Sequence, residues 1–403
     1  MASIKIKYKN EEYSYESGIK LLDILSDLKI DAIAGTIDNK LVSLNFELNH
    51  NCTIDFVNKK DELGNKVYER GLHFLFVKAV REVLNADVKI LSSILNYDYF
   101  EILSNKVINE ITIEKIKIKM RELKEAKMEI SKINVSKDDA INYFERVGQK
   151  DKALSLKYIS NSTISLYKLD NTLDYFYGVM PINTSYIDNF NLKFMKDNKV
   201  VLVKPITYEK EEKLKYEKND ILYNKIREQS MYLDNINISS SCYLNEMISK
   251  NEYQNIIRTS EYTQNEQLFN ITNDIMKNKN IKVLLIAGLT GSGKQTVAQK
   301  LSSYLVSKGY SPIFIPLSSF LIPDNERIID EDSLGINKKE DYNIASLNNK
   351  ISDLLSGKEC TMPGYKDKIS MNDKSIIVLF IFSKNVWCLL HERYTCSHVE
   401  HRS

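Results

Sequence analysis

The sequence predicts a multidomain chain that mixes α/β and α+β architecture, and three observations support this. The 403 residues are enough for two to four domains. Residues 1–60 alternate between apolar and polar as short strands do, whereas residues 66–208 combine helical and strand-like patterns. Residues 283–286 form a short, wholly apolar run, which is typical of a central parallel strand covered on both faces.

The first segment, residues 1–60, predicts a compact β-rich unit. Ile4, Ile6 and Tyr8 would lie on one face of a strand, and residues 12–15 would form its hairpin partner. The remaining elements expected here are a short helix at 19–28 and strands at 32–37, 40–42 and 53–56.

The second segment, residues 66–208, predicts an α+β unit. Residues 72–84 show helical spacing of Leu72, Phe76, Val80 and Val83. Further helices are expected at 111–130 and 137–147, and strands at 88–94, 97–102, 162–169, 175–179 and 200–203. Residues 209–280 then predict a helical linker region, and residues 281–403 a third, parallel-sheet domain whose tail is atypical from about residue 380.

Composition limits the class of protein. Lysine and arginine number 56 against 54 aspartate and glutamate, so the net charge is only +2 and a nucleic-acid partner is not expected. No apolar run approaches the ~18 residues of a membrane span, and no secretory signal opens the chain. Five scattered cysteines do not indicate a disulfide framework. We therefore expect a reduced, cytoplasmic protein with no membrane partner; its oligomeric state is left open.

One motif carries chemistry. A glycine-rich loop follows the apolar run 283–286 directly and precedes a helical pattern at 297–306, so the sequence G-x-x-x-x-G-K stands in its required strand–loop–helix context. Its backbone N–H groups and the helix N-terminus would hold the phosphates of ATP, and Lys294 would hold the β- and γ-phosphates as the catalytic residue. The predicted binding residues are Gly288, Leu289, Thr290, Gly291, Ser292, Gly293, Lys294, Gln295 and Thr296.

The residue after the lysine departs from the motif. A Ser or Thr hydroxyl normally ligates Mg²⁺ there, whereas this chain has Gln295, followed by Thr296. Either the glutamine carbonyl oxygen or the threonine hydroxyl would have to serve as the Mg²⁺ ligand.

With the loop placed, the order of parts resembles bacterial nucleoside kinases that carry threonyl-tRNA-synthetase-like regions ahead of a uridine kinase/phosphoribulokinase domain. Residues 1–58 look like a TGS domain, a small β-grasp unit. Residues 68–205 look like the second additional domain of threonyl-tRNA synthetases, on the stretches 139–144 and 175–181. The resemblance implies an incomplete P-loop NTPase domain at the end, and transfer of phosphate from ATP to the 5′-hydroxyl of uridine or cytidine.

The chain departs from that pattern at several positions. The two metal-ligating histidines of the synthetase editing site would fall at Gly71 and Leu75, with His73 between them, so editing activity is not expected. The Asp that acts as base in the kinases is replaced by Ser318-Ser319. Tyr365, in a Pro-x-Tyr pattern, would contact the nucleoside base.

The end of the chain changes character. Only about three parallel strands fit after residue 282, fewer than the five or six that are usual in such sheets. The tail beyond residue 380 holds the only tryptophan, which suggests a frameshift or truncation. The alternative is a zinc site formed by Cys388, His391, Cys396 and His398, although this spacing matches no common zinc module.

The leading interpretation is therefore an ATP- and Mg²⁺-dependent pyrimidine nucleoside kinase, with nucleotides and nucleosides as its ligands. Two alternatives remain open. One is a catalytically impaired nucleotide-binding or regulatory relative, favoured by Gln295 and by Ser318-Ser319. The other is an RNA- or tRNA-binding module that uses the synthetase-like segments and retains the phosphate loop as a vestige.

Overall fold

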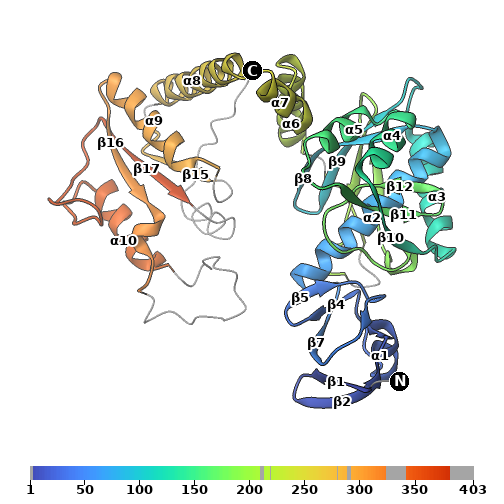
Figure 1. Ribbon diagram of the computed structural model, residues 1–403. Helices are drawn as coiled ribbons and strands as arrows, with labels where there is room; N and C mark the ends of the chain where they lie inside the picture. Colours follow the sequence, from blue (N-terminus) through green and yellow to red (C-terminus); the bar gives the residue numbers. More distant parts are fainter. Residues whose placement is uncertain are drawn as a thin grey trace. The chain divides into compact units, whose positions relative to one another are not determined.

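The structure is a computed structural model that describes residues 3–208, 213–217, 219–278, 280–287, 292–323 and 342–381. The chain divides into two compact units, Met1–Glu252 and Tyr253–Ser403. Both units combine helices with sheets, which confirms the predicted mixed α/β character (Figure 1). The finer division into four segments stays a prediction.

The first unit begins with a five-stranded sheet in the order β2-β1-β7-β4-β5. β1 pairs antiparallel with β2 and parallel with β7. Ile4 and Ile6 point inward from β1, as the alternation predicts, and α1 (Leu21–Asp27) packs on the same core. The strands are β1 (Ser3–Tyr8), β2 (Glu11–Glu16), β4 (Ala34–Ile37), β5 (Lys40–Val42) and β7 (Cys52–Val57), with β3 (Ile19–Lys20) and β6 (Glu47–Leu48) as a separate pair.

Helix α2 (Glu62–Leu84) is the central element of the first unit because it is buried on more than one side. Leu72, Phe76 and Val80, spaced one turn apart, pack with the sheet β13-β14-β9-β8. Phe74 points instead into a second cluster with Tyr167 from the sheet β10-β11-β12. The helix therefore joins two sheets.

The rest of this region consists of short elements around α2. They are β8 (Asp87–Ile94), β9 (Tyr97–Leu103), α3 (Glu110–Glu125), β10 (Ile130–Ser136), α4 (Lys137–Arg146), α5 (Lys150–Lys157), β11 (Thr163–Leu169), β12 (Thr172–Asp174), η1 (Thr184–Tyr186), β13 (Asn191–Phe194) and β14 (Lys199–Val203).

Helix α6 (Asp220–Asn235) covers the other face of the sheet β13-β14-β9-β8. Its Tyr223 and Ile226 pack with Tyr99, Val201 and Val203, which point away from α2. Helix α7 (Ser241–Ser249) follows and packs near α5. The sheet is thus sandwiched between α2 and α6, and β8 lies at its edge.

The second unit contains a three-stranded parallel sheet in the order β15-β17-β16. One cluster packs α10 against one face, and another packs α8 and α9 against the other, so the sheet is covered on both sides. The elements are α8 (Gln254–Lys277), β15 (Val283–Ala287), α9 (Lys294–Ser307), β16 (Ser311–Pro316), η2 (Leu317–Phe320), α10 (Ile344–Leu355) and β17 (Ser375–Ile381).

Two predictions about local structure are wrong. Residues 175–179 form an irregular segment instead of a strand, because their backbone carbonyls bond side chains of α2 and β11. The helix expected at 111–130 ends earlier, since α3 stops at Glu125 and β10 starts at Ile130. Both errors occur where tertiary contacts override local periodicity.

Candidate functional site

The N-terminus of α9 stands at the carboxyl end of β15, as the phosphate-loop motif requires. Gly293 precedes the helix with a φ of 78°, a left-handed conformation that suits glycine. Lys294 is the first helical residue, and only 5% of it is exposed. Gly288, Leu289, Thr290 and Gly291 lie outside the described residues, whereas Ser292 is described and exposed.

Gln295 and Thr296 follow in the first turn of α9, and both are exposed. Each therefore offers a side-chain oxygen that solvent can reach near the helix N-terminus. Within the described ranges, no group of three or more His, Cys, Asp or Glu side chains could hold a metal ion. The four residues of the zinc alternative, from Cys388 to His398, lie beyond the part of the chain that the structure covers.

The strands of the second unit are parallel, so their carboxyl ends meet at one edge of the sheet. The chain leaves β15, passes through α9 and returns as β16, while β17 lies between them. Ligands of open α/β sheets bind at this edge where the strand order reverses. Ser318 and Ser319 follow the end of β16 in η2; Ser318 is exposed and Ser319 half-buried.

Tyr365 uses its hydroxyl within the fold. The hydroxyl oxygen accepts a hydrogen bond from the Phe314 backbone N–H at 2.8 Å and donates one to the Phe314 carbonyl oxygen at 3.2 Å. Phe314 lies on β16, the edge strand of the sheet. The tyrosine hydroxyl thus bonds both backbone groups of Phe314; its predicted contact with a nucleoside stays a prediction.

On α2, Gly71 and Leu75, where the synthetase resemblance would place two histidines, are tightly packed. A Cβ atom at Gly71 would lie 2.6 Å from Cγ of Pro181, so no larger side chain fits there without a shift. Leu75 is fully buried. These two positions build the core of the unit.

His73, between them, belongs to a buried charge network. Its Nε2 lies 2.7 Å from Oδ2 of Asp98, which is fully buried. The Lys204 ammonium donates to Oδ1 of Asp98 at 3.0 Å and pairs with Glu69 at 2.7 Å. The Ser93 hydroxyl also donates to Asp98. Side chains from α2, from β8 and from the residue after β14 therefore contact the carboxylate of Asp98 on β9.

The balance of forces on Asp98 favours its charged form. Burial alone would raise its pKa, but the hydrogen bond from His73 and the charges of His73 and Lys204 outweigh it, so the pKa of Asp98 lies below its usual value. The hydroxyl of Ser93 bonds Asp98 and not His73, so the group does not form a nucleophile–base pair. The network holds α2, β8 and β9 in register.

The segment 175–181 lies along α2 and is held at several points. The Arg70 guanidinium donates to the Val179 carbonyl oxygen at 3.1 Å, and the Tyr167 hydroxyl donates to the Gly178 carbonyl oxygen at 2.7 Å. Gly178 has a φ of +94°, and a Cβ there would lie 2.7 Å from Cζ of Arg70. On this fixed segment Tyr177 is 74% exposed. The segment therefore presents an aromatic ring to solvent on a rigid base.

The ring of Tyr177 packs edge to face with that of Tyr175, at 4.9 Å between the ring centres. Burial and the hydrogen bond with Tyr177 raise the pKa of Tyr175 to about 12. The pair is an apolar surface with hydroxyl groups at its rim.

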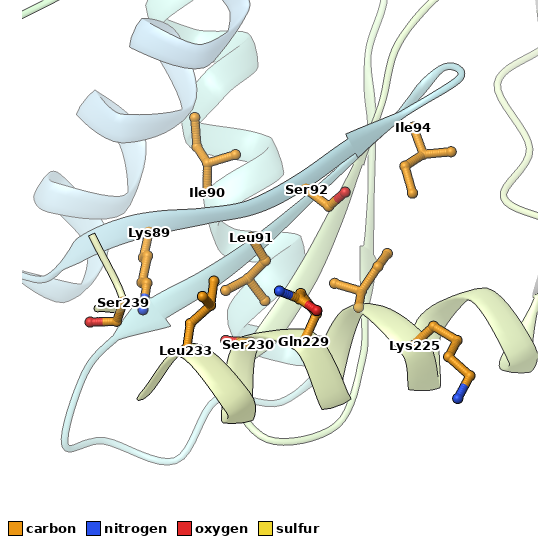
Figure 2. Close-up of a pocket in the computed structure, with 11 residues that line it drawn as sticks. Lys89, Ile90, Leu91, Ser92, Ile94, Lys225, Gln229, Ser230, Leu233 and Ser239 are labelled. Carbon is orange, nitrogen blue, oxygen red and sulfur yellow. The ribbon is translucent and has the colours of Figure 1, made fainter. Parts of the chain in front are cut away.

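A cavity of about 280 Å³ opens between β8 and α6 (Figure 2). Leu91 points from the strand towards the helix, and Gln229 and Leu233 point from the helix towards the strand (Figure 2). The remaining lining residues are Lys89, Ile90, Ser92, Ile94, Lys225, Ile226, Ser230 and Ser239. Sequence reasoning missed this cavity and the Asp98 network, because both combine residues far apart in the chain.

The chain is a two-unit protein. Its first unit is an α+β scaffold around α2, and its second unit is a parallel sheet with helices on both faces. No family model matches the chain. It is 27% identical over 179 residues to a threonine–tRNA ligase of Clostridium kluyveri, a stretch that covers 42% of this chain and 28% of the ligase. It is 27% identical over 183 residues to the threonine–tRNA ligase of Francisella tularensis subsp. holarctica, covering 44% and 29%. The chain thus spans less than a third of the length of these relatives.

These relatives correct the leading interpretation. The nucleoside kinase assignment, with its uridine kinase/phosphoribulokinase family, is wrong: the relatives found are tRNA ligases. The kinase likeness depended on a short phosphate-loop motif, which occurs in proteins of many activities. The exclusion of nucleic-acid partners is also wrong, because it used only a net charge of +2, and the relatives act on tRNA. None of the helices in the described ranges is long and apolar enough to cross a membrane.

Proposed function

We propose that the first unit is a tRNA-binding module related to threonine–tRNA ligases. The observation that carries this proposal is the similarity to those ligases. The matched stretch is 42% of 403 residues, or about 169, whereas the unit Tyr253–Ser403 has 151, so the match includes part of the first unit. A tRNA-binding role also suits the cytoplasmic location expected from the sequence.

A near-neutral protein needs contacts other than charge to hold RNA. Unpaired RNA bases stack on exposed aromatic rings, and each stacked base contributes about 1–3 kcal/mol. Tyr177 supports such a contact, because it is 74% exposed on a segment fixed by Arg70 and Tyr167. A fixed ring loses little conformational entropy when a base stacks on it.

The test is tRNA binding by fluorescence anisotropy, with total tRNA, a tRNA specific for threonine and a duplex RNA of equal length as probes. Tyr177→Ala should weaken tRNA binding by about 5- to 100-fold if one base stacks there, whereas Tyr177→Phe keeps the ring and should bind as wild type. Tyr262→Ala is the matched control, because Tyr262 is 69% exposed but lies on α8. If the wild-type chain binds neither tRNA probe more tightly than the duplex RNA, the proposal is wrong.

A second function is favoured by a separate observation: the end of β15, Gly293 and Lys294 form a strand–loop–helix junction at the carboxyl edge of a parallel sheet. We infer that Gly288–Thr296 binds the phosphates of a nucleotide such as ATP. The helix N-terminus would attract the anion, and Lys294 would contribute a cation. The exposed side-chain oxygen of either Gln295 or Thr296 would complete the shell of a phosphate-bound Mg²⁺.

This second function is tested by ATP titration in the presence of Mg²⁺ and of a chelator. Lys294→Ala removes a charge-assisted hydrogen bond of about 1.5–3 kcal/mol, so ATP should bind about 10- to 100-fold more weakly. Lys300→Ala is the control, since Lys300 lies on the same helix and bonds Gln264. If wild type and Lys294→Ala bind ATP with equal affinity, the phosphate-site assignment is wrong.

A further inference from the structure

The cavity between β8 and α6 has the composition of a ligand site. Its two walls are aliphatic, with Leu91 and Ile94 on the strand and Ile226 and Leu233 on the helix. The hollow, of about 280 Å³, opens to solvent beside this packed cluster. Ligand sites combine such apolar walls with a few polar groups that converge on them.

Four uncharged polar side chains line this cavity. Ser92, Gln229, Ser230 and Ser239 line it, and within the described residues their side chains make no hydrogen bond to protein. Ser92, Ser230 and Ser239 are nevertheless half-buried. Hydroxyl and carboxamide groups both donate and accept hydrogen bonds. The cavity therefore suits a partner with donors and acceptors along its edge and apolar faces.

The charges at the cavity indicate a neutral ligand. Lys89 lies 3.4 Å from Asp234, and Lys225 lies 2.7 Å from Glu228, so each ammonium has a carboxylate partner. Lys225 also points away from the strand (Figure 2). An anionic ligand would have to displace these pairs.

The size limits the ligand to a single ring system. Pockets for drug-sized ligands begin at roughly 300 Å³, and this cavity lies just below that at about 280 Å³. An extended peptide added to β8 is disfavoured, because a β-bulge between Ile90 and Ser92 interrupts the strand and Lys89 projects from it. Both features protect sheet edges against strand addition.

We propose that this cavity binds one unpaired nucleobase, whose faces contact the aliphatic walls and whose edge bonds Gln229 and the serine hydroxyls. A nucleobase is planar and neutral, and it presents donors and acceptors along one edge, as the lining demands. The proposal rests on the proposed tRNA-binding function for its source of bases; a free nucleoside offers the same chemistry. Gln229, as a carboxamide, is suited to the paired donor and acceptor of adenine.

The experiment uses the full chain with two kinds of probe: 2-aminopurine riboside, with the four natural nucleosides as competitors, and a tRNA carrying 2-aminopurine at single-stranded positions. Ser230→Leu fills the cavity and removes one hydroxyl, and Gln229→Ala removes the carboxamide without filling it. Asn224→Leu is the matched control, because Asn224 is exposed on the same helix and does not line the cavity. Circular dichroism confirms folding of each variant.

The expected result is binding of the riboside, or capture of one tRNA base, by wild type and Asn224→Leu. Ser230→Leu should bind about tenfold more weakly or not at all, and Gln229→Ala should bind several-fold more weakly, as for loss of one hydrogen bond. A response of the free riboside alone assigns the cavity to a nucleoside, and a response of the tRNA probe alone assigns it to an RNA base.

The proposal is overturned if wild type changes the fluorescence of neither probe, or if Ser230→Leu behaves as wild type with both. Its failure is separable from that of the proposed function. Wild type that binds tRNA without a fluorescence change refutes only the cavity, whereas wild type that binds the riboside but no tRNA refutes only the tRNA-binding module.

Discussion

Lys204 in the first unit and Lys294 in the second are both almost completely buried, with 3% and 5% exposed. Their surroundings differ. Lys204 follows β14 and contacts the carboxylates of Glu69 and Asp98, which come from α2 and β9. Lys294 opens α9 after a glycine-rich loop, at the edge of a sheet where ligands of this architecture bind.

The difference teaches that burial of a lysine does not by itself mark a functional site. A buried ammonium must be paired, since leaving it without a partner is costly. When two carboxylates of the same unit provide the pairing, as around Lys204, the group serves the fold. Lys294 stands instead at a helix N-terminus, a position that attracts anions.

The largest expected effect is a difference in the free energy of unfolding between variants of the two lysines. Lys204→Met breaks a buried pair and leaves Asp98 undercompensated, which should destabilise the first unit by about 3–5 kcal/mol. Lys294→Met keeps the methylene stem and removes a positive charge from a helix N-terminus, where a cation is unfavourable, so its cost should be smaller. Urea unfolding, with hydrogen exchange of α2 peptides for Lys204→Met and of α9 peptides for Lys294→Met, measures the two effects.

Lys193→Met is the control for that comparison. Lys193 pairs with Glu110 at 3.4 Å, and its side chain is 53% exposed, so the loss should stay below about 1 kcal/mol. Equal loss of stability in Lys204→Met and Lys193→Met would contradict a structural role for the buried network.

The next effect concerns pH. Because the pKa of Asp98 is lowered in the fold, its contribution to stability is complete above the pKa of the unfolded chain, about 3.9. The contribution is lost as the pH falls through the lower folded value. The part of the stability difference between wild type and Asp98→Asn that comes from this carboxylate should therefore shrink as the pH falls from about 5 into stronger acid.

Urea midpoints measured across that range provide the check. Asp234→Asn is the matched control, since Asp234 has a side chain that is 53% exposed and pairs with Lys89 only at 3.4 Å. If the stability difference between wild type and Asp98→Asn grows as the pH falls in that range, the pKa of Asp98 is not lowered in the fold.

The smallest effect lies at the contact between α7 and α5. The Tyr243 hydroxyl donates to Oδ1 of Asp151 at 2.6 Å, and this hydrogen bond is the main reason that the pKa of Tyr243 rises to about 12. The neutral tyrosine is therefore favoured in the fold, and its contribution is present below pH ~10 and lost as the pH rises through about 12.

Tyr243→Phe should cost about 1 kcal/mol or less, because the site is partly open to solvent. Thermal unfolding near pH 7 measures this loss, and spectrophotometric titration of tyrosine should show one fewer late-titrating group in the variant. If the group lost in the variant titrates near pH 10 instead of near 12, the bond to Asp151 does not form.

Much of the local structure could be predicted from the sequence. The inward side chains of β1, the one-turn spacing of Leu72, Phe76 and Val80, and the apolar run of β15 before α9 all follow from local periodicity. The phosphate-loop residues were placed at a strand–helix junction, although their role stays a prediction. The kinase identity was not predictable, because a short motif constrains the backbone and not the reaction.

The sequence by itself determined where most helices and strands form and which of their faces are apolar, since these depend on neighbours within a few residues; the segment 175–179 is an exception. Only the tertiary structure decided that Glu69, His73, Asp98 and Lys204 share one network, that residues 175–181 lie against α2, and that β8 and α6 enclose a cavity. The physical reason is that hydrogen bonds and charges act over a few ångströms in space, whereas Asp98 and Lys204 are 106 positions apart in the chain. Local periodicity in the sequence does not indicate such contacts.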